Sequence, residues 1–189
     1  MANLTSGFMT ERLVARLWMG SDAPQLFAMM SRRDVSKWTS IPDPMTEVSQ
    51  ARERIALWAR AIEGHDALGI WAIISKSSQA VSGMVLLRPL VDSSSIEIGW
   101  SLHPDHWGRG YATEAAGAAL AHAFAHGYQR VVAIMRPDNA RSAAVCHRLG
   151  MAELGVMQDP WHGTPAAPTS LMFEACADTW VSRPGPART

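Results

Sequence analysis

The sequence predicts a single α/β domain whose sheet contains both antiparallel and parallel neighbours. Its 189 residues, 48% hydrophobic and 18% charged, suit one globular domain with a sizeable core. Two strand-like segments at 68–75 and 80–90, joined by the turn KSSQ, are typical of an antiparallel hairpin. From Ile96 to Leu149 the order strand, loop, helix, strand, helix is typical of a right-handed crossover between parallel or splayed strands.

The N-terminal third contains a strand, two helices and an irregular connection. ERLVARLW at 11–18 alternates as a strand does, and a short helix over 22–30 opens with an Asp and a Pro. DVSKWTSIPDP at 34–44 carries two prolines and several turn formers, so it predicts a loop or short turns. A helical pattern then runs over 46–62.

Beyond the hairpin, the chain alternates between strands and helices. The segment 96–101 alternates apolar and polar residues as a strand does, and RVVAIM at 130–135 is typical of a buried strand. A second helix begins at Asp138 or Asn139 and ends at Leu149. The helix between the two strands has one apolar face, formed by Ala112, Ala115, Ala116, Ala119, Leu120 and Ala123. These small side chains let that helix lie close to a sheet.

Charge and cysteine content exclude several classes of protein. Seventeen basic and seventeen acidic side chains cancel, so nothing favours nucleic acid or an acidic membrane as a partner. No segment has the length of a signal peptide core or a membrane span, so we expect a cytoplasmic protein, a monomer or a homodimer. Cys146 and Cys176 are expected to be free thiols, and we expect no metal site. The domain spans 1–181, and the Pro- and Arg-containing tail 182–189 is expected to be disordered.

The stretch WGRGYATEA, from Trp107 to Ala115, opens a helix with two glycines and an arginine. The first turn of a helix leaves backbone N–H groups without intrahelical partners, and its dipole favours an anion. Gly108 and Gly110 would let a phosphate approach the backbone, and Arg109 adds a cation. The stretch therefore favours a pyrophosphate site, although an ordinary glycine-containing turn is an open alternative.

Two other phosphate motifs fit less well. A Walker loop needs Gly-Lys-Ser/Thr, which is absent here. The dinucleotide fingerprint needs a third glycine where Thr113 stands and needs the strand to end directly before the loop, whereas HPDHW intervenes. A dinucleotide-binding oxidoreductase is therefore the second-ranked interpretation.

The runs IEIGWSLHPDHWGRGYATEAAGAALAHAF and RPDNARSAAVCHRLGM resemble the acetyl-CoA-binding half of the GNAT superfamily of N-acetyltransferases, most closely the branch of ribosomal-protein N-terminal acetyltransferases. In that family the motif Gln/Arg-x-x-Gly-x-Gly/Ala cradles the pyrophosphate of coenzyme A. Gly110 and Ala112 fill the small positions, and Trp107 stands where Gln or Arg is usual. The resemblance implies a GNAT-like α+β domain with a mixed, mostly antiparallel sheet, a splayed parallel pair and helices on both faces.

The resemblance also implies which residues meet the co-substrate, acetyl-CoA. The strand ending at Ser101 and Leu102 would pair its backbone with pantetheine, and the helix that follows the next strand would contribute Asn139 and Ser142. The implied cofactor-binding set is Ser101, Leu102, Trp107, Gly108, Arg109, Gly110, Tyr111, Ala112, Thr113, Asn139 and Ser142.

Acyl transfer to an amine needs a base, a polarised carbonyl and an acid for the departing thiolate. Glu97 is the candidate base, with a solvated strand carboxylate as the alternative. Backbone N–H groups near Ser101 and Leu102 are candidates for polarising the carbonyl. Cys146 and Ser142 are both candidate acids, and plain packing is the alternative for Cys146.

The acceptor is expected to be a peptide N-terminus or a small-molecule amine. Trp38 and Trp161 lie in the least regular segments, so they are candidates for the acceptor pocket, with core packing as the alternative. A non-catalytic module that binds an acyl-CoA as a signal is a further alternative for the whole chain.

Overall fold

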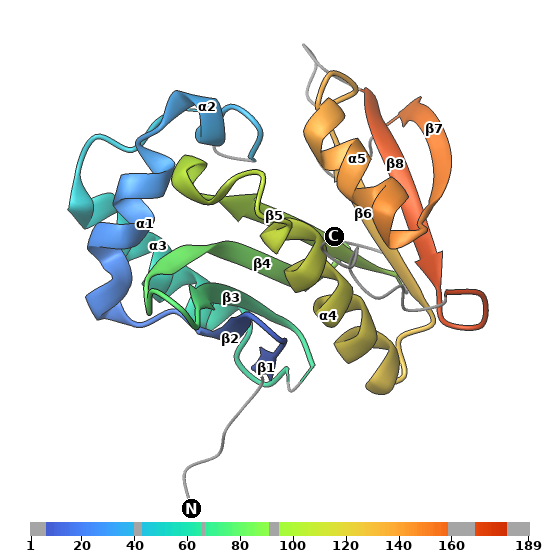
Figure 1. The fold of residues 1–189 in the computed structure, drawn as a ribbon, viewed down its shortest axis with the longest axis horizontal. Coiled ribbons are helices and arrows are strands. Elements are labelled where there is room, and N and C mark those ends of the chain that lie inside the picture. Colours follow the sequence, from blue (N-terminus) through green and yellow to red (C-terminus); the bar gives the residue numbers. More distant parts are fainter. Residues whose placement is uncertain (1–6, 40–42, 66, 91–94, 159–168, 181–189) are drawn as a thin grey trace, which may run out of the picture.

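Eight strands form one sheet in the part of the chain that the structure, a computed structural model, describes (Figure 1). The described residues are 7–39, 43–65, 67–90, 95–158 and 169–180. The strands are β1 (Phe8–Met9), β2 (Leu13–Leu17), β3 (Gly69–Ser75), β4 (Val81–Pro89), β5 (Ile96–Leu102), β6 (Arg130–Met135), β7 (Ala152–Gln158) and β8 (Thr169–Cys176). The helices are α1 (Ala23–Met30), α2 (Arg33–Ser36), α3 (Val48–Ala61), α4 (Tyr111–Ala125) and α5 (Ala140–Leu149), with 3₁₀ turns at Gly20–Asp22 and Pro104–His106.

The sheet has the order β1-β2-β3-β4-β5-β6-β8-β7, and β5 and β6 are its parallel neighbours among otherwise antiparallel pairs. The pairing of β5 with β6 covers Ile96 to Ile98 on one strand and Val131 to Ala133 on the other. Beyond these residues β5 stays paired with β4 as far as Leu102, while β6 diverges from it (Figure 1). The predicted mixed sheet with a splayed parallel pair is therefore confirmed.

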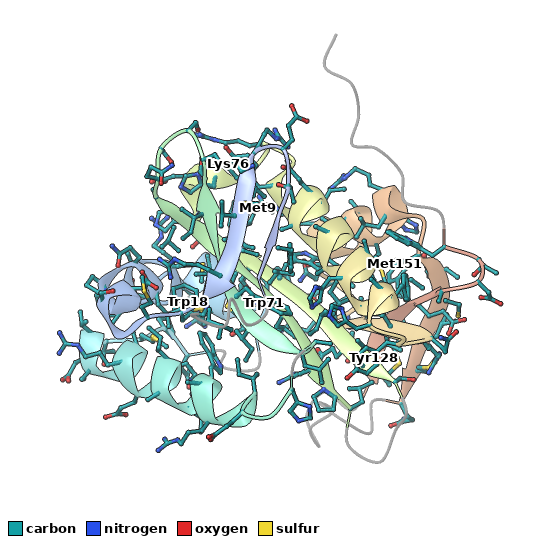
Figure 2. The ribbon with its side chains drawn as sticks, turned by 90° about the horizontal axis from the view of Figure 1, so that it is seen from below. Met9, Trp18, Trp71, Lys76, Tyr128 and Met151 are labelled. Atoms are coloured by element: carbon teal, nitrogen blue, oxygen red, sulfur yellow. The ribbon has the colours of Figure 1, made fainter. Side chains whose placement is uncertain are left out.

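Helices cover both faces of the sheet and enclose two hydrophobic clusters. One cluster lies between the sheet and α4 and α5, and it includes Trp71 and Met151. The other lies between the sheet and α1 and α3, and it includes Trp18 (Figure 2). The alternation of side chains along each strand sends successive residues to these two layers.

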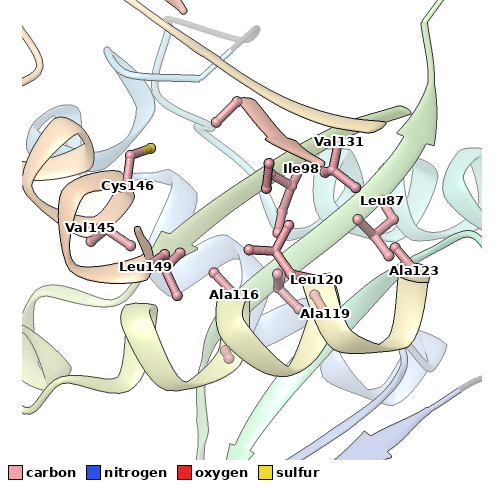
Figure 3. Close-up of a cluster of buried hydrophobic side chains, with 14 of the residues drawn as sticks. Leu87, Ile98, Ala116, Ala119, Leu120, Ala123, Val131, Val145, Cys146 and Leu149 are labelled. Carbon is pink, nitrogen blue, oxygen red and sulfur yellow. The ribbon is translucent and has the colours of Figure 1, made fainter. Parts of the chain in front are cut away.

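Helix α4 lies against the centre of the sheet through its small side chains. Ala116, Ala119 and Ala123 are completely buried, and Leu120 packs with Ile98 in the same cluster (Figure 3). Because alanine adds little bulk beyond the backbone, the helix axis can approach the strands closely. Contacts of α4 with β4 and β5 fix where its first turn lies relative to the end of β5.

Some elements differ from the sequence prediction. The segment 34–44, expected to be a loop or short turns, begins within the one-turn helix α2, which buries Val35 in the cluster with α1 and α3. Strands β7 and β8 follow α5, in a part of the chain for which the sequence predicted no individual strands. Most side chains of β7 are exposed, so this edge strand lacks the apolar alternation that identifies a strand in a sequence.

A half-buried carboxylate ties the start of α4 to the N-terminal strands. Glu114, in the first turn of α4, accepts hydrogen bonds from the Thr10 hydroxyl, the Arg12 backbone N–H and the Arg12 guanidinium. Arg12 also donates to the carbonyl of Arg109, at 2.9 Å, in the loop that precedes the helix. Burial raises the pKa of Glu114, but the hydrogen bonds from Thr10 and Arg12 outweigh it and leave the pKa below its ordinary value. The ionised carboxylate therefore stabilises the fold.

Replacing Glu114 with glutamine is expected to lower the free energy of unfolding by about 1–2 kcal/mol at pH 7, because charged hydrogen bonds are lost. A depressed carboxyl pKa contributes stability above the unfolded-state pKa, and this contribution disappears as pH falls through the folded-state pKa. The difference between wild type and E114Q, measured by urea unfolding, should therefore shrink as the pH falls from about 5 toward about 3. Glu53→Gln, on the exposed face of α3, is the control and should show no such difference. An E114Q deficit that is the same at every pH would contradict this assignment.

Candidate functional site

The divergence of β5 from β6 joins two cavities. The first has a volume of about 600 Å³ and lies between the end of β5, the start of α4 and α5. The second, of about 540 Å³, lies over β4, β5 and β6 on the α1 and α3 side of the sheet. Both are lined by Trp38, Trp100, Ser101, Asn139 and Ser142. A molecule in one cavity can therefore meet a molecule in the other at the opening of the sheet.

The loop before α4 has the conformation that its glycines allow. Gly108 and Gly110 have φ angles of 74° and 77°, in the left-handed region that other residues rarely adopt. A Cβ atom built on Gly108 would meet nothing within 4 Å, so that position borders open space in the first cavity. The Trp107 ring N–H donates to the Leu102 carbonyl at 2.9 Å and fixes the loop on the end of β5.

Several backbone N–H groups at the start of α4 are available to an anion. The Glu114 N–H donates to the Gly110 carbonyl, at 3.0 Å, as the first hydrogen bond of the helix. The N–H groups of Tyr111, Ala112 and Thr113 precede that bond, so the helix itself offers them no acceptor. They lie at the positive end of the helix dipole, and all three residues line the first cavity.

Two arginines of α5 lie beside these N–H groups. The N–H groups of Tyr111, Ala112 and Thr113 and these two arginines together form what we call the anion cradle. The Arg141 guanidinium lies 4.4 Å from the centre of the Trp107 ring, and Arg148 donates to the Thr113 hydroxyl at 3.1 Å. Both arginines line the first cavity. The backbone N–H groups and the two guanidinium groups suit a ligand that carries a diphosphate and, elsewhere in the molecule, one more phosphate. Sequence reasoning missed both arginines, although they stand in the quoted run RPDNARSAAVCHRLGM.

Nearly all of the predicted cofactor-binding residues line the first cavity. They are Ser101, Leu102, Trp107, Gly108, Gly110, Tyr111, Ala112, Thr113, Asn139 and Ser142. Arg109 is the exception, and its carbonyl instead accepts a hydrogen bond from Arg12. The Tyr111 ring is buried and stacks on His106, so Tyr111 presents its backbone to the cavity.

His106 is a neutral neighbour of the cradle. Burial lowers its pKa from the ordinary value of 6.5, and the charge of Arg109 lowers it further. Its Nδ1 atom is buried and has no hydrogen-bond partner among the described residues. A neutral imidazole adds no charge of its own to the anion site near pH 7.

The strand geometry decides which backbone groups of β5 face the opening. The His103 N–H donates to the carbonyl of Ser82 in β4, and N–H groups alternate in direction along a strand. Ser101 therefore directs its N–H toward β4, whereas Trp100 and Leu102 direct theirs to the side that β6 has left. The pairing of Ile96 to Ile98 with β6 follows the same alternation.

The two candidate acids on α5 have different surroundings. Asn139 caps the helix, and its side-chain oxygen accepts the Ser142 N–H at 3.3 Å. Ser142 lines both cavities. Cys146, one turn further along, is completely buried in the core (Figure 3), lines neither cavity, and burial raises the pKa of its thiol to about 12.

Glu97 lies in the second cavity as half of an ion pair. The β4–β5 register places it directly opposite Arg88, and the Arg88 guanidinium donates to its carboxylate at 2.5 Å. The residue is only 6% exposed, so it is not a solvated strand carboxylate. Trp38 lines this cavity too, while Trp161, the other predicted acceptor residue, lies outside the described residues.

The described residues hold no group of three His, Cys, Asp or Glu side chains placed to bind a metal ion. In the same ranges, no helix has the length and apolar character needed to cross a membrane.

Comparison with known proteins identifies the family. The family model described as "Acetyltransferase (GNAT) domain" matches residues 12–152. The uncharacterized N-acetyltransferase p20 of Bacillus licheniformis is 31% identical over 153 residues, covering 79% of this chain and 84% of the relative. The uncharacterized N-acetyltransferase YoaA of Bacillus subtilis (strain 168) is 27% identical over 161 residues, covering 82% of this chain and 89% of the relative.

The fold is shared with solved acetyltransferases. The structure of RimL, a ribosomal L7/L12 alpha-N-protein acetyltransferase in complex with coenzyme A, superposes with a TM-score of 0.76 at 17% identity. The superposition covers 90% of this chain and 98% of that one. Because the family model matches from Arg12 to Ala152 and a relative named as an N-acetyltransferase is 31% identical over 79% of this chain, this chain belongs to the GNAT family of acetyltransferases.

Proposed function

We propose that this protein transfers an acetyl group from acetyl-CoA to a primary amine by direct attack in a ternary complex. The observation that carries the proposal is the meeting of two cavities at the opening between β5 and β6. One cavity has an anion cradle suited to a diphosphate, and the other has a buried carboxylate. Separate sites for donor and acceptor that meet at one point allow transfer without a covalent enzyme intermediate.

The first cavity would hold coenzyme A through the start of α4. The N–H groups of Tyr111, Ala112 and Thr113 would bind the diphosphate, with Arg141 and Arg148 beside them. The Trp100 carbonyl and the N–H of Leu102, on the open side of β5, would pair with the pantetheine amides. Coenzyme A in the RimL complex supports this choice of ligand.

Bound acetyl-CoA supplies an activated thioester carbonyl and a thiolate leaving group. The chain supplies the groups around that carbonyl. The Trp100 N–H, which none of the described strands faces, would polarise the carbonyl, an effect worth about 3 kcal/mol per donor in acyl transfer. Ser142 lines both cavities, and its hydroxyl would give the thiolate a proton while taking one from the ammonium nitrogen of the tetrahedral intermediate, so that no alkoxide is left. Cys146 contributes packing, since it is buried and its thiol holds its proton tightly.

Glu97 is the proposed base for the acceptor amine. An α-amine titrates near pH 8 and needs only about 1.4 kcal/mol to lose its proton at pH 7, whereas a lysine needs about 4.6 kcal/mol. The guanidinium of Arg88 neutralises part of the Glu97 charge, so Glu97 is suited to the smaller of these tasks. The pair therefore favours an α-amine acceptor over a lysine side chain.

The interpretation as a dinucleotide-binding oxidoreductase is set aside because the chain belongs to the GNAT family. A non-catalytic module that binds acyl-CoA is the remaining alternative. Such a module would bind coenzyme A and release no thiol with any amine. Coenzyme A binding and acetyl transfer to an amine must therefore be measured separately.

Replacing Gly108 with alanine is expected to weaken coenzyme A binding about tenfold, because the new methyl group would occupy space that the diphosphate needs. Gly127→Ala is the matched control: its φ of 87° gives similar strain and a Cβ there also meets nothing, but it lies at the far end of α4. Isothermal titration calorimetry measures both. Equal affinities in the two variants, or no heat with the wild type, would contradict the cradle.

Replacing Ser142 with alanine is expected to lower kcat about 100-fold at saturating acetyl-CoA, because the thiolate loses its proton donor. Cys146→Ala should keep its kcat and lose about 1–2 kcal/mol of stability, because it leaves a void in the core. Thiol release and thermal unfolding measure the two effects. Full turnover in S142A would remove Ser142 from the proposed chemistry.

Replacing Glu97 with glutamine is expected to lower kcat/KM for an α-amine about tenfold at pH 7, with the deficit closing above pH 8 as the amine deprotonates unaided. Glu174→Gln is the control, since Glu174 also pairs with an arginine, Arg130 at 2.8 Å, but lines neither cavity. A pH-independent deficit, or the same deficit in both variants, would show that Glu97 is only structural.

A further inference from the structure

The second cavity has a surplus of positive charge. Its described lining residues include four cationic side chains and one acidic side chain, an excess of three. The cations are Lys37, Arg54, Arg88 and Arg136, and the acid is Glu97. The whole chain has a formal net charge of zero, so this concentration of positive charge is a local feature.

The acidic partners account for only part of that charge. Arg88 is paired with Glu97 inside the cavity, and Arg136 is paired with Asp138 beside it at 3.0 Å. When Asp138 is counted with Glu97, the four cations still exceed the acidic side chains by two. Arg54, on α3, forms no ion pair or hydrogen bond with another described residue.

Two of the cations are gathered around one tryptophan at the junction of the cavities. The Lys37 ammonium lies 4.5 Å from the centre of the Trp38 ring, and the Arg136 guanidinium lies 5.4 Å from it. Trp58, on α3, and Trp100, on β5, add two further indoles to the lining. The cavity therefore combines aromatic walls with cations, and the carboxylate of Glu97 lines the same cavity.

From this charge pattern we infer that the acceptor is a small amine that also carries an anionic group, a carboxylate or a phosphate. The inference rests on the proposed function and names its substrate class. Lys37, Arg54 and Arg136 would bind the anionic group, while the amine reaches the opening between β5 and β6 near Glu97. Polyamines and aminoglycosides are disfavoured, because a polycation would enter a cavity of like charge.

The test compares acceptors that differ in one anionic group, all of them dipeptides with an amidated C-terminus. Phenylalanyl-glutamate amide and phenylalanyl-glutamine amide have nearly the same size and the same α-amine, and they differ by one carboxylate. Phenylalanyl-phosphoserine amide and phenylalanyl-serine amide differ by one phosphate. We expect kcat/KM to be about tenfold higher for the anionic member of at least one pair, and spermidine to be a poor acceptor. The preference for the anionic acceptor should weaken as the salt concentration is raised from about 50 to about 500 mM, because salt screens the attraction between charges.

Arg54→Gln should reduce the preference for the anionic acceptor over its neutral counterpart to about threefold or less in kcat/KM. Arg52→Gln, on the exposed face of the same helix, should leave it unchanged. Equal rates within both pairs, a preference that R54Q retains, or efficient acetylation of spermidine would overturn the inference while leaving acetyl transfer intact. Coenzyme A binding without transfer to any of these amines would instead overturn the proposed function.

Discussion

The parting of β5 from β6 is the constraint on which the rest of the site depends. A sheet separates its two faces, because paired backbones leave no passage between strands. Here the pairing ends at Ile98 and Ala133, so the layer of α4 and α5 communicates with the layer of α1 and α3. Both cavities, and the residues that they share, exist because of this opening.

The strands can part because each keeps another partner. Beyond Ile98, β5 remains paired with β4, and beyond Ala133, β6 remains paired with β8 as far as Met135. The cost of unpaired backbone groups is therefore confined to one side of each strand. On β5 that side carries Trp100 and Leu102, and the Leu102 carbonyl is already satisfied by Trp107.

The sequence was informative where local patterns decide the structure. The helix start at Gly110, the alanine face of α4 and the crossover from β5 to β6 all follow from neighbouring residues, and the structure has them. The predicted cofactor residues lie together for the same reason, since most belong to one loop and one helix turn.

Features that depend on distant residues could not be read in this way. Glu114 and Arg12 meet across 102 positions of the chain, and no local pattern marks either as a partner of the other. The cations of the second cavity come from α2, α3, β4 and β6 or the residues beside them, so only the assembled fold shows their grouping. Cys146 and Ser142 lie one turn apart in sequence, and only the assembled fold shows that Cys146 is buried in the core whereas Ser142 lines both cavities.

The bond between Glu114 and Arg12 also bears on the order in which the molecule assembles. Contacts of such long sequence separation form late, because closing a long loop costs entropy before the contact stabilises anything. The loop that carries Arg109 is held by Arg12, so its final shape awaits the docking of the N-terminal strands. A fragment containing only the crossover half of the chain would have the glycines and the helix, yet it would lack the contact that rigidifies them during folding.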